Sequence, residues 1–162
     1  LRAMADFWGL DNIMTRESSE IEYPPAAQTL SEKKKADQNA RLSLINDTPG
    51  GVLLSIHQNN YPAQSPHGIQ VFYGTSGDGD RLAVLLQQQL TEQLCPDNRR
   101  VAEPIDEGIY LMRMAQCPAV LVECGFLSNP ADLEHLKDEA YQTQLAAVML
   151  ASCLEYIRGY AI

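Results

Sequence analysis

Two residues at the ends of apolar segments, Glu123 and His57, have side chains that could carry out chemistry. Glu123 follows the apolar run 119–122, in which β-branched residues predict a buried strand. His57 ends a second such run, 51–56. A carboxylate is rarely buried without a partner, and ligand sites in open α/β sheets form at the carboxyl ends of the strands. We therefore expect both side chains at one edge of a sheet, where they could meet across a cleft.

A histidine and a glutamate in that position suit a hydrolytic zinc site. The imidazole binds the metal, and a glutamate that is not a ligand takes the proton from the activated water. A structural alternative is that His57 is a core histidine with its hydrogen bonds satisfied and that Glu123 belongs to an ion pair. For two residues taken alone this alternative is favoured, and the surrounding motifs decide against it.

Segments of strand and helix character alternate along the chain. Strands are expected at 12–15, 51–57, 68–73 and 119–123, and helices at 1–8, 31–46, 81–94, 130–137 and 141–158. Residues 109–114 are apolar but too few to assign, and 101–108 read as irregular. The alternation predicts an α/β fold with a twisted, mostly parallel sheet and helices on both faces.

Composition limits the kinds of partner. A chain of 162 residues is expected to form one domain, 1–162, and its net charge of −9 disfavours binding to nucleic acid or anionic lipid. No apolar run reaches the length of a membrane span. The four cysteines show neither a C-x-x-C pair nor zinc-knuckle spacing, so neither a cysteine zinc site nor a disulfide framework is expected.

Several motifs are then found in a characteristic order. Ser-Ile-His-Gln-Asn occupies 55–59, Gly-Ile-Gln-Val-Phe-Tyr occupies 68–73, and a Val-Glu-x-Gly-Phe-x-Ser-Asn pattern lies within 118–130. In order and spacing they resemble the zinc-dependent N-acetylmuramoyl-L-alanine amidases, which cut bacterial peptidoglycan. The resemblance extends to 14–16 and 41–46 and so covers essentially the whole chain. Segments 31–37 and 65–73 are most similar to the spore-cortex branch of that family.

The resemblance implies an amidase/phosphorylase-like fold and a role for particular residues. His57 matches a zinc ligand, and Glu123 matches the glutamate that acts as general base and then protonates the leaving amine. Asn59 and Arg113 are substrate or oxyanion contacts by position, although an ordinary surface ion pair explains Arg113 equally well. The bond cut joins the lactyl group of muramic acid to L-alanine. The partner is then peptidoglycan, and the location is extracytoplasmic, at the cell wall or spore cortex.

The sequence also departs from the family. The family's first strand leads into Gly-His-Gly-Gly, whose histidine binds zinc, and a glutamate ligand follows on the next helix; neither is present here. We therefore expect an N-terminally incomplete catalytic domain that lacks the first strand and has an incomplete zinc site. The residues weighed as substitute ligands are His67, His135, Glu17, Glu20 and Glu22, all expected at surface or loop positions.

Two other functions stay open. The chain could be a non-catalytic peptidoglycan-binding or regulatory relic without the metal. More remotely, it could be a thiol hydrolase that uses Cys124. Because adjacent residues of a strand point to opposite faces, Cys124 is expected beneath the sheet and away from Glu123.

Overall fold

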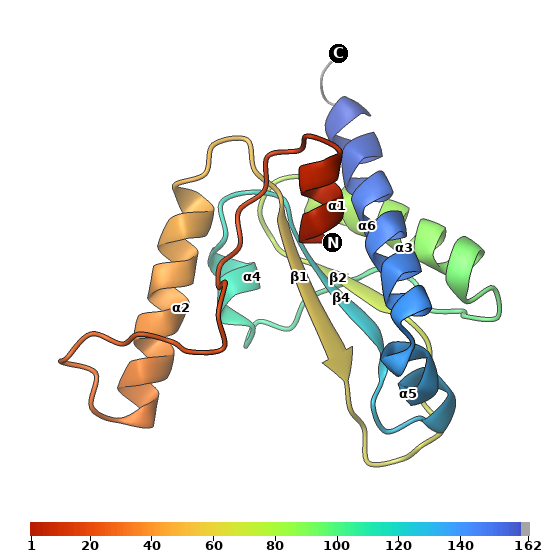
Figure 1. The fold of residues 1–162 in the computed structure, drawn as a ribbon, viewed down its shortest axis with the longest axis horizontal. Coiled ribbons are helices and arrows are strands. Elements are labelled where there is room, and N and C mark those ends of the chain that lie inside the picture. Colours follow the sequence, from red (N-terminus) through yellow and green to blue (C-terminus); the bar gives the residue numbers. More distant parts are fainter. Residues whose placement is uncertain (160–162) are drawn as a thin grey trace.

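The computed structural model describes residues 1–159; residues 160–162, the end of the predicted domain, lie outside the described residues. Its centre is a four-stranded sheet in the order β1-β4-β2-β3 (Figure 1), formed by β1 (Leu53–Asn59), β4 (Ala119–Phe126), β2 (Gln70–Tyr73) and β3 (Glu103–Pro104). β1 runs parallel to β4 and β3 parallel to β2, whereas β2 and β4 are antiparallel. The predicted α/β class is confirmed, with a mixed sheet.

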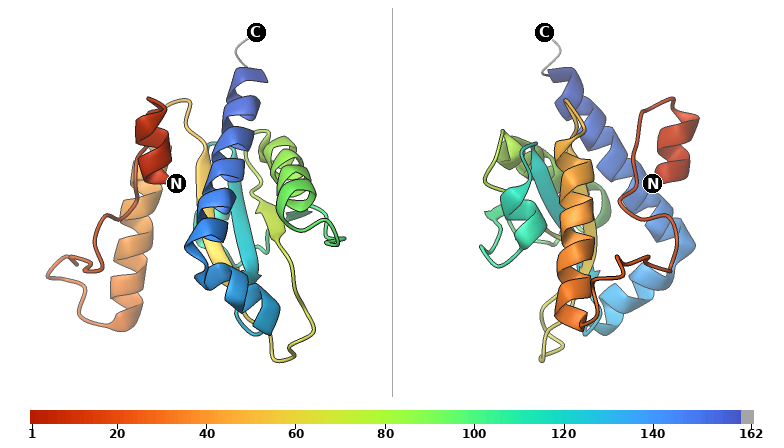
Figure 2. Two further views of the ribbon diagram at one scale, coloured as in Figure 1. Left: turned by 45° about the vertical axis from the view of Figure 1, so that its right-hand side comes forward. Right: turned by 90° about the vertical axis from the view of Figure 1, so that its left-hand side faces the viewer.

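Helices lie on both faces of this sheet, as predicted (Figure 2). One face is covered by α3 (Gly79–Leu94) and α6 (Glu139–Gly159), with α1 (Arg2–Phe7) and α5 (Pro130–Lys137) packed against α6. On the other side lie α2 (Leu30–Asn46) and the short α4 (Tyr110–Met114), which contact each other. No helix within residues 1–159 is long and apolar enough to cross a membrane.

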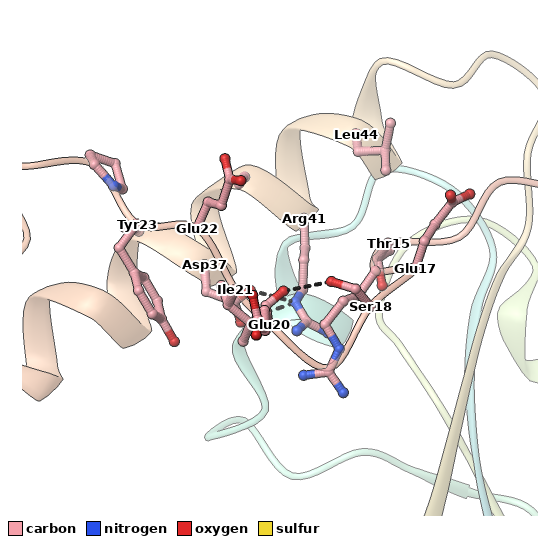
Figure 3. Close-up of a pocket in the computed structure, with 14 residues that line it drawn as sticks. Thr15, Glu17, Ser18, Glu20, Ile21, Glu22, Tyr23, Asp37, Arg41 and Leu44 are labelled. Carbon is pink, nitrogen blue, oxygen red and sulfur yellow. Dashed lines mark hydrogen bonds and ion pairs between the residues drawn. The ribbon is translucent and has the colours of Figure 1, made fainter.

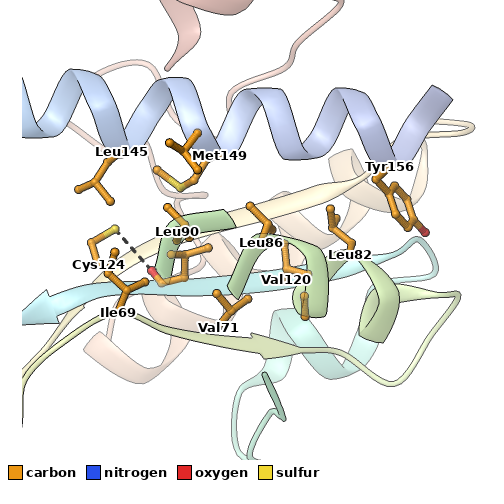
Figure 4. Close-up of a cluster of buried hydrophobic side chains, with 13 residues drawn as sticks. Ile69, Val71, Leu82, Leu86, Leu90, Val120, Cys124, Leu145, Met149 and Tyr156 are labelled. Carbon is orange, nitrogen blue, oxygen red and sulfur yellow. Dashed lines mark hydrogen bonds between the residues drawn. The ribbon is translucent and has the colours of Figure 1, made fainter. Parts of the chain in front are cut away.

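Successive side chains of β4 point to opposite faces of the sheet and so belong to two separate buried clusters. Val120, Val122 and Cys124 pack with residues of α3 and α6 in the larger buried cluster. Figure 4 shows Val120 and Cys124 in this cluster. Ala119 and Leu121 belong to a second cluster, which takes in residues of α2 and α4. Since side chains alternate between faces, Glu123 belongs to the α2/α4 side of the sheet.

Three local predictions were wrong. Residues 12–15 form no strand: no described strand pairs with them, and Ile13 and Met14 remain 59% and 45% exposed, so little apolar burial would stabilise one. α2 begins after Thr29 and not at Ser31, because Thr29 and Glu32 form a reciprocal capping box. The region 101–108 contains β3, which two residues form against β2.

Candidate active site

His57 and Glu123 lie directly opposite each other on neighbouring strands. β1 and β4 are parallel, and their register pairs Ser55 with Leu121 and His57 with Glu123. Residues paired in this way point to the same face, and adjacent strands are only about 4.8 Å apart. The structure thus brings together the two side chains that the sequence predicted to share a strand edge, on the α2/α4 side of the sheet.

Glu123 is a partly buried carboxylate whose hydrogen bonding is incomplete. Its Oε2 atom is buried and has no hydrogen-bond partner among the described residues. Burial raises the pKa of Glu123, and the charge of the nearby His57 partly opposes that rise. An unpaired buried oxygen costs on the order of 1–3 kcal/mol. This cost is typical of a group whose partner arrives with a ligand, such as a water molecule or a substrate.

His57 is exposed and belongs to an edge strand, since β4 is the only described strand paired with β1. Its Nε2 atom lies 3.1 Å from the Oγ atom of Ser55, two residues earlier on the same face. The imidazole is therefore not the buried core histidine of the structural alternative. That alternative also placed Glu123 in an ion pair, and no ion pair among residues 1–159 includes Glu123.

The last residues of β4 and the turn into α5 fix the strand end that carries Glu123. At Gly125 φ is +154°, and a Cβ atom there would lie 3.2 Å from Oδ2 of Asp132, so glycine suits this position. The same Oδ2 accepts hydrogen bonds from the backbone N–H groups of Phe126 (2.8 Å) and Gly68 (2.9 Å). Asn129 caps α5 through the N–H groups of Ala131 and Asp132, as its sequence context predicted.

Among residues 1–159, no hydrogen bond or ion pair joins Asn59 or Arg113 to Glu123. Asn59 ends β1, where its Oδ1 accepts from the N–H of Asn60 and its carbonyl accepts from Leu127. Arg113 lies exposed in the last turn of α4 and makes no ion pair within residues 1–159. Their proposed roles as substrate or oxyanion contacts stay predictions.

Cys124 and the two other histidines occupy the positions expected of non-catalytic residues. Cys124 is 4% exposed on the opposite face of the sheet, and burial raises its pKa to about 12, so its thiol is protonated near neutral pH. His67 is an exposed loop residue, and His135 stacks on Tyr141 at the surface of α5. The thiol-hydrolase alternative gains no support from this environment.

The early loop carries the remaining candidate ligands to a different place. Glu17, Glu20 and Glu22 line a cavity of about 810 Å³ between residues 15–24 and α2 (Figure 3). Across it, the half-buried Asp37 and Arg41 of α2 form an ion pair of 3.0 Å. Neither His57 nor Glu123 lines this cavity, so the loop carboxylates do not complete a site with them.

The described residues fit a metal site only in part. The accessible imidazole of His57 is a suitable ligand, and the unpartnered Oε2 of Glu123 is suited to hold a polarised water beside it. A catalytic zinc has typically three protein ligands, yet no group of three or more His, Cys, Asp or Glu residues that could hold a metal lies within residues 1–159. Further ligands would have to come from outside the part of the chain described.

Two residues near Glu123 were not singled out from the sequence. Gln70 is the register partner of Glu123 on β2 and is 3% exposed. Arg100 donates a hydrogen bond to Oε1 of Gln70. The sequence marks Gln70 only as a polar residue inside the apolar run 68–73. The sheet register is needed to show that Gln70 lies opposite Glu123.

Comparison with known proteins defines the class. The sequence pattern of the N-acetylmuramoyl-L-alanine amidase family matches residues 8–153, and the chain belongs to that family. Within it, the chain is 36% identical over 145 residues to the germination-specific N-acetylmuramoyl-L-alanine amidase of Bacillus subtilis, covering 89% of this chain and 60% of the relative. It is also 30% identical over 121 residues to the Bacillus subtilis amidase LytC, covering 73% of this chain and 24% of LytC.

A solved structure agrees in fold. The CwlD amidase of Clostridioides difficile, determined in complex with the GerS lipoprotein, superposes with a TM-score of 0.88 at 29% identity, covering 97% of this chain and 80% of CwlD. The germination-specific and CwlD-type relatives confirm the resemblance to the spore-cortex branch. The chain spans about 60% of the length of its germination-specific relative.

Proposed function

We propose that this chain is the greater part of the catalytic domain of a peptidoglycan amidase. The bond hydrolysed joins the lactyl group of N-acetylmuramic acid to the L-alanine of the stem peptide. Family membership supports the reaction class. The observation that carries the proposal is the parallel register of His57 and Glu123, with a buried Glu123 oxygen that has no partner among the described residues.

Glu123 supplies the proton transfers. With Oε2 unpaired and a raised pKa, its carboxylate is a stronger base than an exposed glutamate. It takes a proton from the attacking water while the water oxygen bonds to the amide carbon. It then gives that proton to the amide nitrogen as the carbon–nitrogen bond breaks, which leaves a lactyl carboxylic acid and a free L-alanine amine. General acid–base help of this kind contributes typically 10²–10⁴-fold.

His57 would hold a zinc ion together with ligands from outside the described residues. Zinc bound there supplies Lewis acidity, which polarises the amide carbonyl and acidifies a water molecule. In this proposal His57 acts only as a neutral imidazole ligand, and its accessible position on the edge strand supports that role. Peptidoglycan lies outside the cytoplasm, so the proposed place of action is the cell wall or spore cortex.

Product analysis tests the reaction. Purified peptidoglycan is incubated with the full-length protein and Zn²⁺, and the products are identified by mass spectrometry. The proposal predicts stem peptides that begin with a free L-alanine amine and glycan strands with a free lactyl carboxylate. Binding to peptidoglycan without release of these peptides would instead favour the non-catalytic alternative, for which the incomplete metal site is the supporting observation. Cleavage between sugars or within the stem peptide would refute the proposed bond.

A further inference from the structure

The side chain of Arg100 is fixed in place by three contacts. Its Nε atom donates to the carbonyl of His67 (3.2 Å), and its Nη1 atom donates to Oε1 of Gln70 (3.3 Å). The guanidinium also lies 4.9 Å from the centre of the Phe126 ring, a cation–π distance. The residue is half-buried, and this set of contacts leaves little rotational freedom to the guanidinium.

Two of these contacts place the guanidinium beside the candidate active site. Gln70 is the cross-strand partner of Glu123, and such partners have Cβ atoms about 5 Å apart. Phe126 is the last residue of β4, three positions after Glu123. Arg100 therefore lies at the same strand end as the candidate general base, on the β2 side, whereas His57 lies on the β1 side.

Within the described part of the chain, Arg100 has no anionic partner. The sequence holds 21 Asp and Glu residues, yet none of the ion pairs formed within residues 1–159 includes Arg100. Its side chain hydrogen bonds are made to two neutral oxygens, and a guanidinium has five N–H donors. A fixed guanidinium with donors to spare matches the two oxygens of a carboxylate.

We propose that Arg100 is a specificity residue that binds a carboxylate of the stem peptide. This inference rests on the proposed function. The second stem residue is a glutamate joined through its γ-carboxyl, so its α-carboxyl is either free or amidated. That group follows the scissile amide by two residues, a reach of about 7 Å in an extended chain. The Cβ atoms of Glu123 and Gln70 are about 5 Å apart, and the Arg100 guanidinium lies at the end of the Gln70 side chain. A carboxyl group about 7 Å from an amide held at Glu123 can therefore come close to Arg100. Arg100 then selects stem peptides in which the α-carboxyl is free.

Binding is measured in the full-length protein carrying Glu123→Gln, so that substrate is not consumed. The two probes are muropeptides identical except that the second residue carries an α-carboxylate or an α-carboxamide. A charge-assisted bidentate contact predicts about tenfold tighter binding of the carboxylate form. Adding Arg100→Gln should bring the two dissociation constants to within about twofold. The matched control is Arg99→Gln, which removes the same charge from the exposed neighbouring residue and should preserve the tenfold preference.

Each outcome has one meaning. Equal binding of the two muropeptides when Arg100 is intact would overturn the inference and leave the proposed function standing. A preference that persists in the Arg100→Gln protein would also overturn it, because a purely structural role for Arg100 changes both affinities together. Arg100→Lys should keep part of the preference, since the charge remains but the planar fork is lost. Binding of neither muropeptide, with Arg100 and Arg99 intact, would refute the proposed function itself.

Discussion

Replacing Glu123 by glutamine separates proton transfer from every other property of the site. Glutamine keeps the side-chain volume and one acceptor oxygen but cannot take a proton from water. Because general acid–base catalysis contributes typically 10²–10⁴-fold, kcat/KM should fall by that factor. The fall corresponds to about 3–5 kcal/mol of transition-state stabilisation. The assay is the rate at which free L-alanine amines appear in peptidoglycan, with Glu103→Gln as a control, since Glu103 is an exposed carboxylate of the same sheet.

Replacing Glu123 by glutamine should also change how the stability of the protein depends on pH. Burial raises the pKa of Glu123 in the folded protein, so the folded state binds its proton more tightly than the unfolded chain does. That contribution to stability is fully present below the unfolded pKa and is lost as pH rises through the folded pKa. Glu123→Gln should therefore be at least as stable as the unsubstituted protein at pH 7, and its relative advantage should shrink as the pH falls from 7 toward the ordinary glutamate value of about 4.5 and be absent below it. Urea unfolding at both pH values measures this difference.

Two results would refute the reasoning. Turnover of Glu123→Gln within tenfold of the unsubstituted enzyme would show that Glu123 is not the general base. A variant that is clearly less stable at pH 7 would show that the Glu123 carboxylate is stabilised in the fold, contrary to its unpartnered Oε2 atom.

The remaining predictions concern the residues around Glu123. Asp132→Ala leaves the backbone N–H groups of Phe126 and Gly68 without their acceptor and should lower the free energy of unfolding by about 3 kcal/mol. Urea unfolding measures this loss, with the exposed Asp97→Ala as control. A loss below about 0.5 kcal/mol, equal to that of the control, would contradict the assigned role of Asp132. Cys124→Ala should cost about 1 kcal/mol of stability through lost packing and leave kcat/KM within about threefold, because the buried thiol does not face Glu123. Loss of hydrolysis in a folded Cys124→Ala protein would instead revive a thiol mechanism.

Much of this site follows from local sequence patterns. Runs of apolar residues ending in His57 and Glu123 predicted two buried strands; both strands form, but only β4 is buried, and β1 is a partly exposed edge strand. The rule that parallel strands end at one edge predicted that these residues would meet. The position of Cys124 followed from the alternation of side chains along a strand. The Asn129-Pro130 pair likewise predicted the start of α5.

Other features depend on contacts that no local pattern contains. Strand direction is one: β2 follows β1 in the chain but lies antiparallel to β4, so Gln70 and not its neighbours faces Glu123. Arg100 reaches Gln70 from 30 residues away. Residues 12–15 have strand-like composition yet pair with no described strand, which shows that propensity without a partner does not make a strand. Within the unassigned run 109–114, residues 110–114 form α4, and its Met112 packs in the buried cluster that contains Ala119 and Leu121 of β4.

Metal content tests the central claim, that His57 and Glu123 act at one hydrolytic metal site. The full-length protein and three variants are purified, dialysed against Zn²⁺ and then against metal-free buffer, and analysed for zinc. We expect about one zinc ion per chain in the unsubstituted protein, in Glu123→Gln and in the exposed-histidine control His67→Ala, and near none in His57→Ala. Zinc retained in His57→Ala, or none in the unsubstituted protein, would contradict the claim.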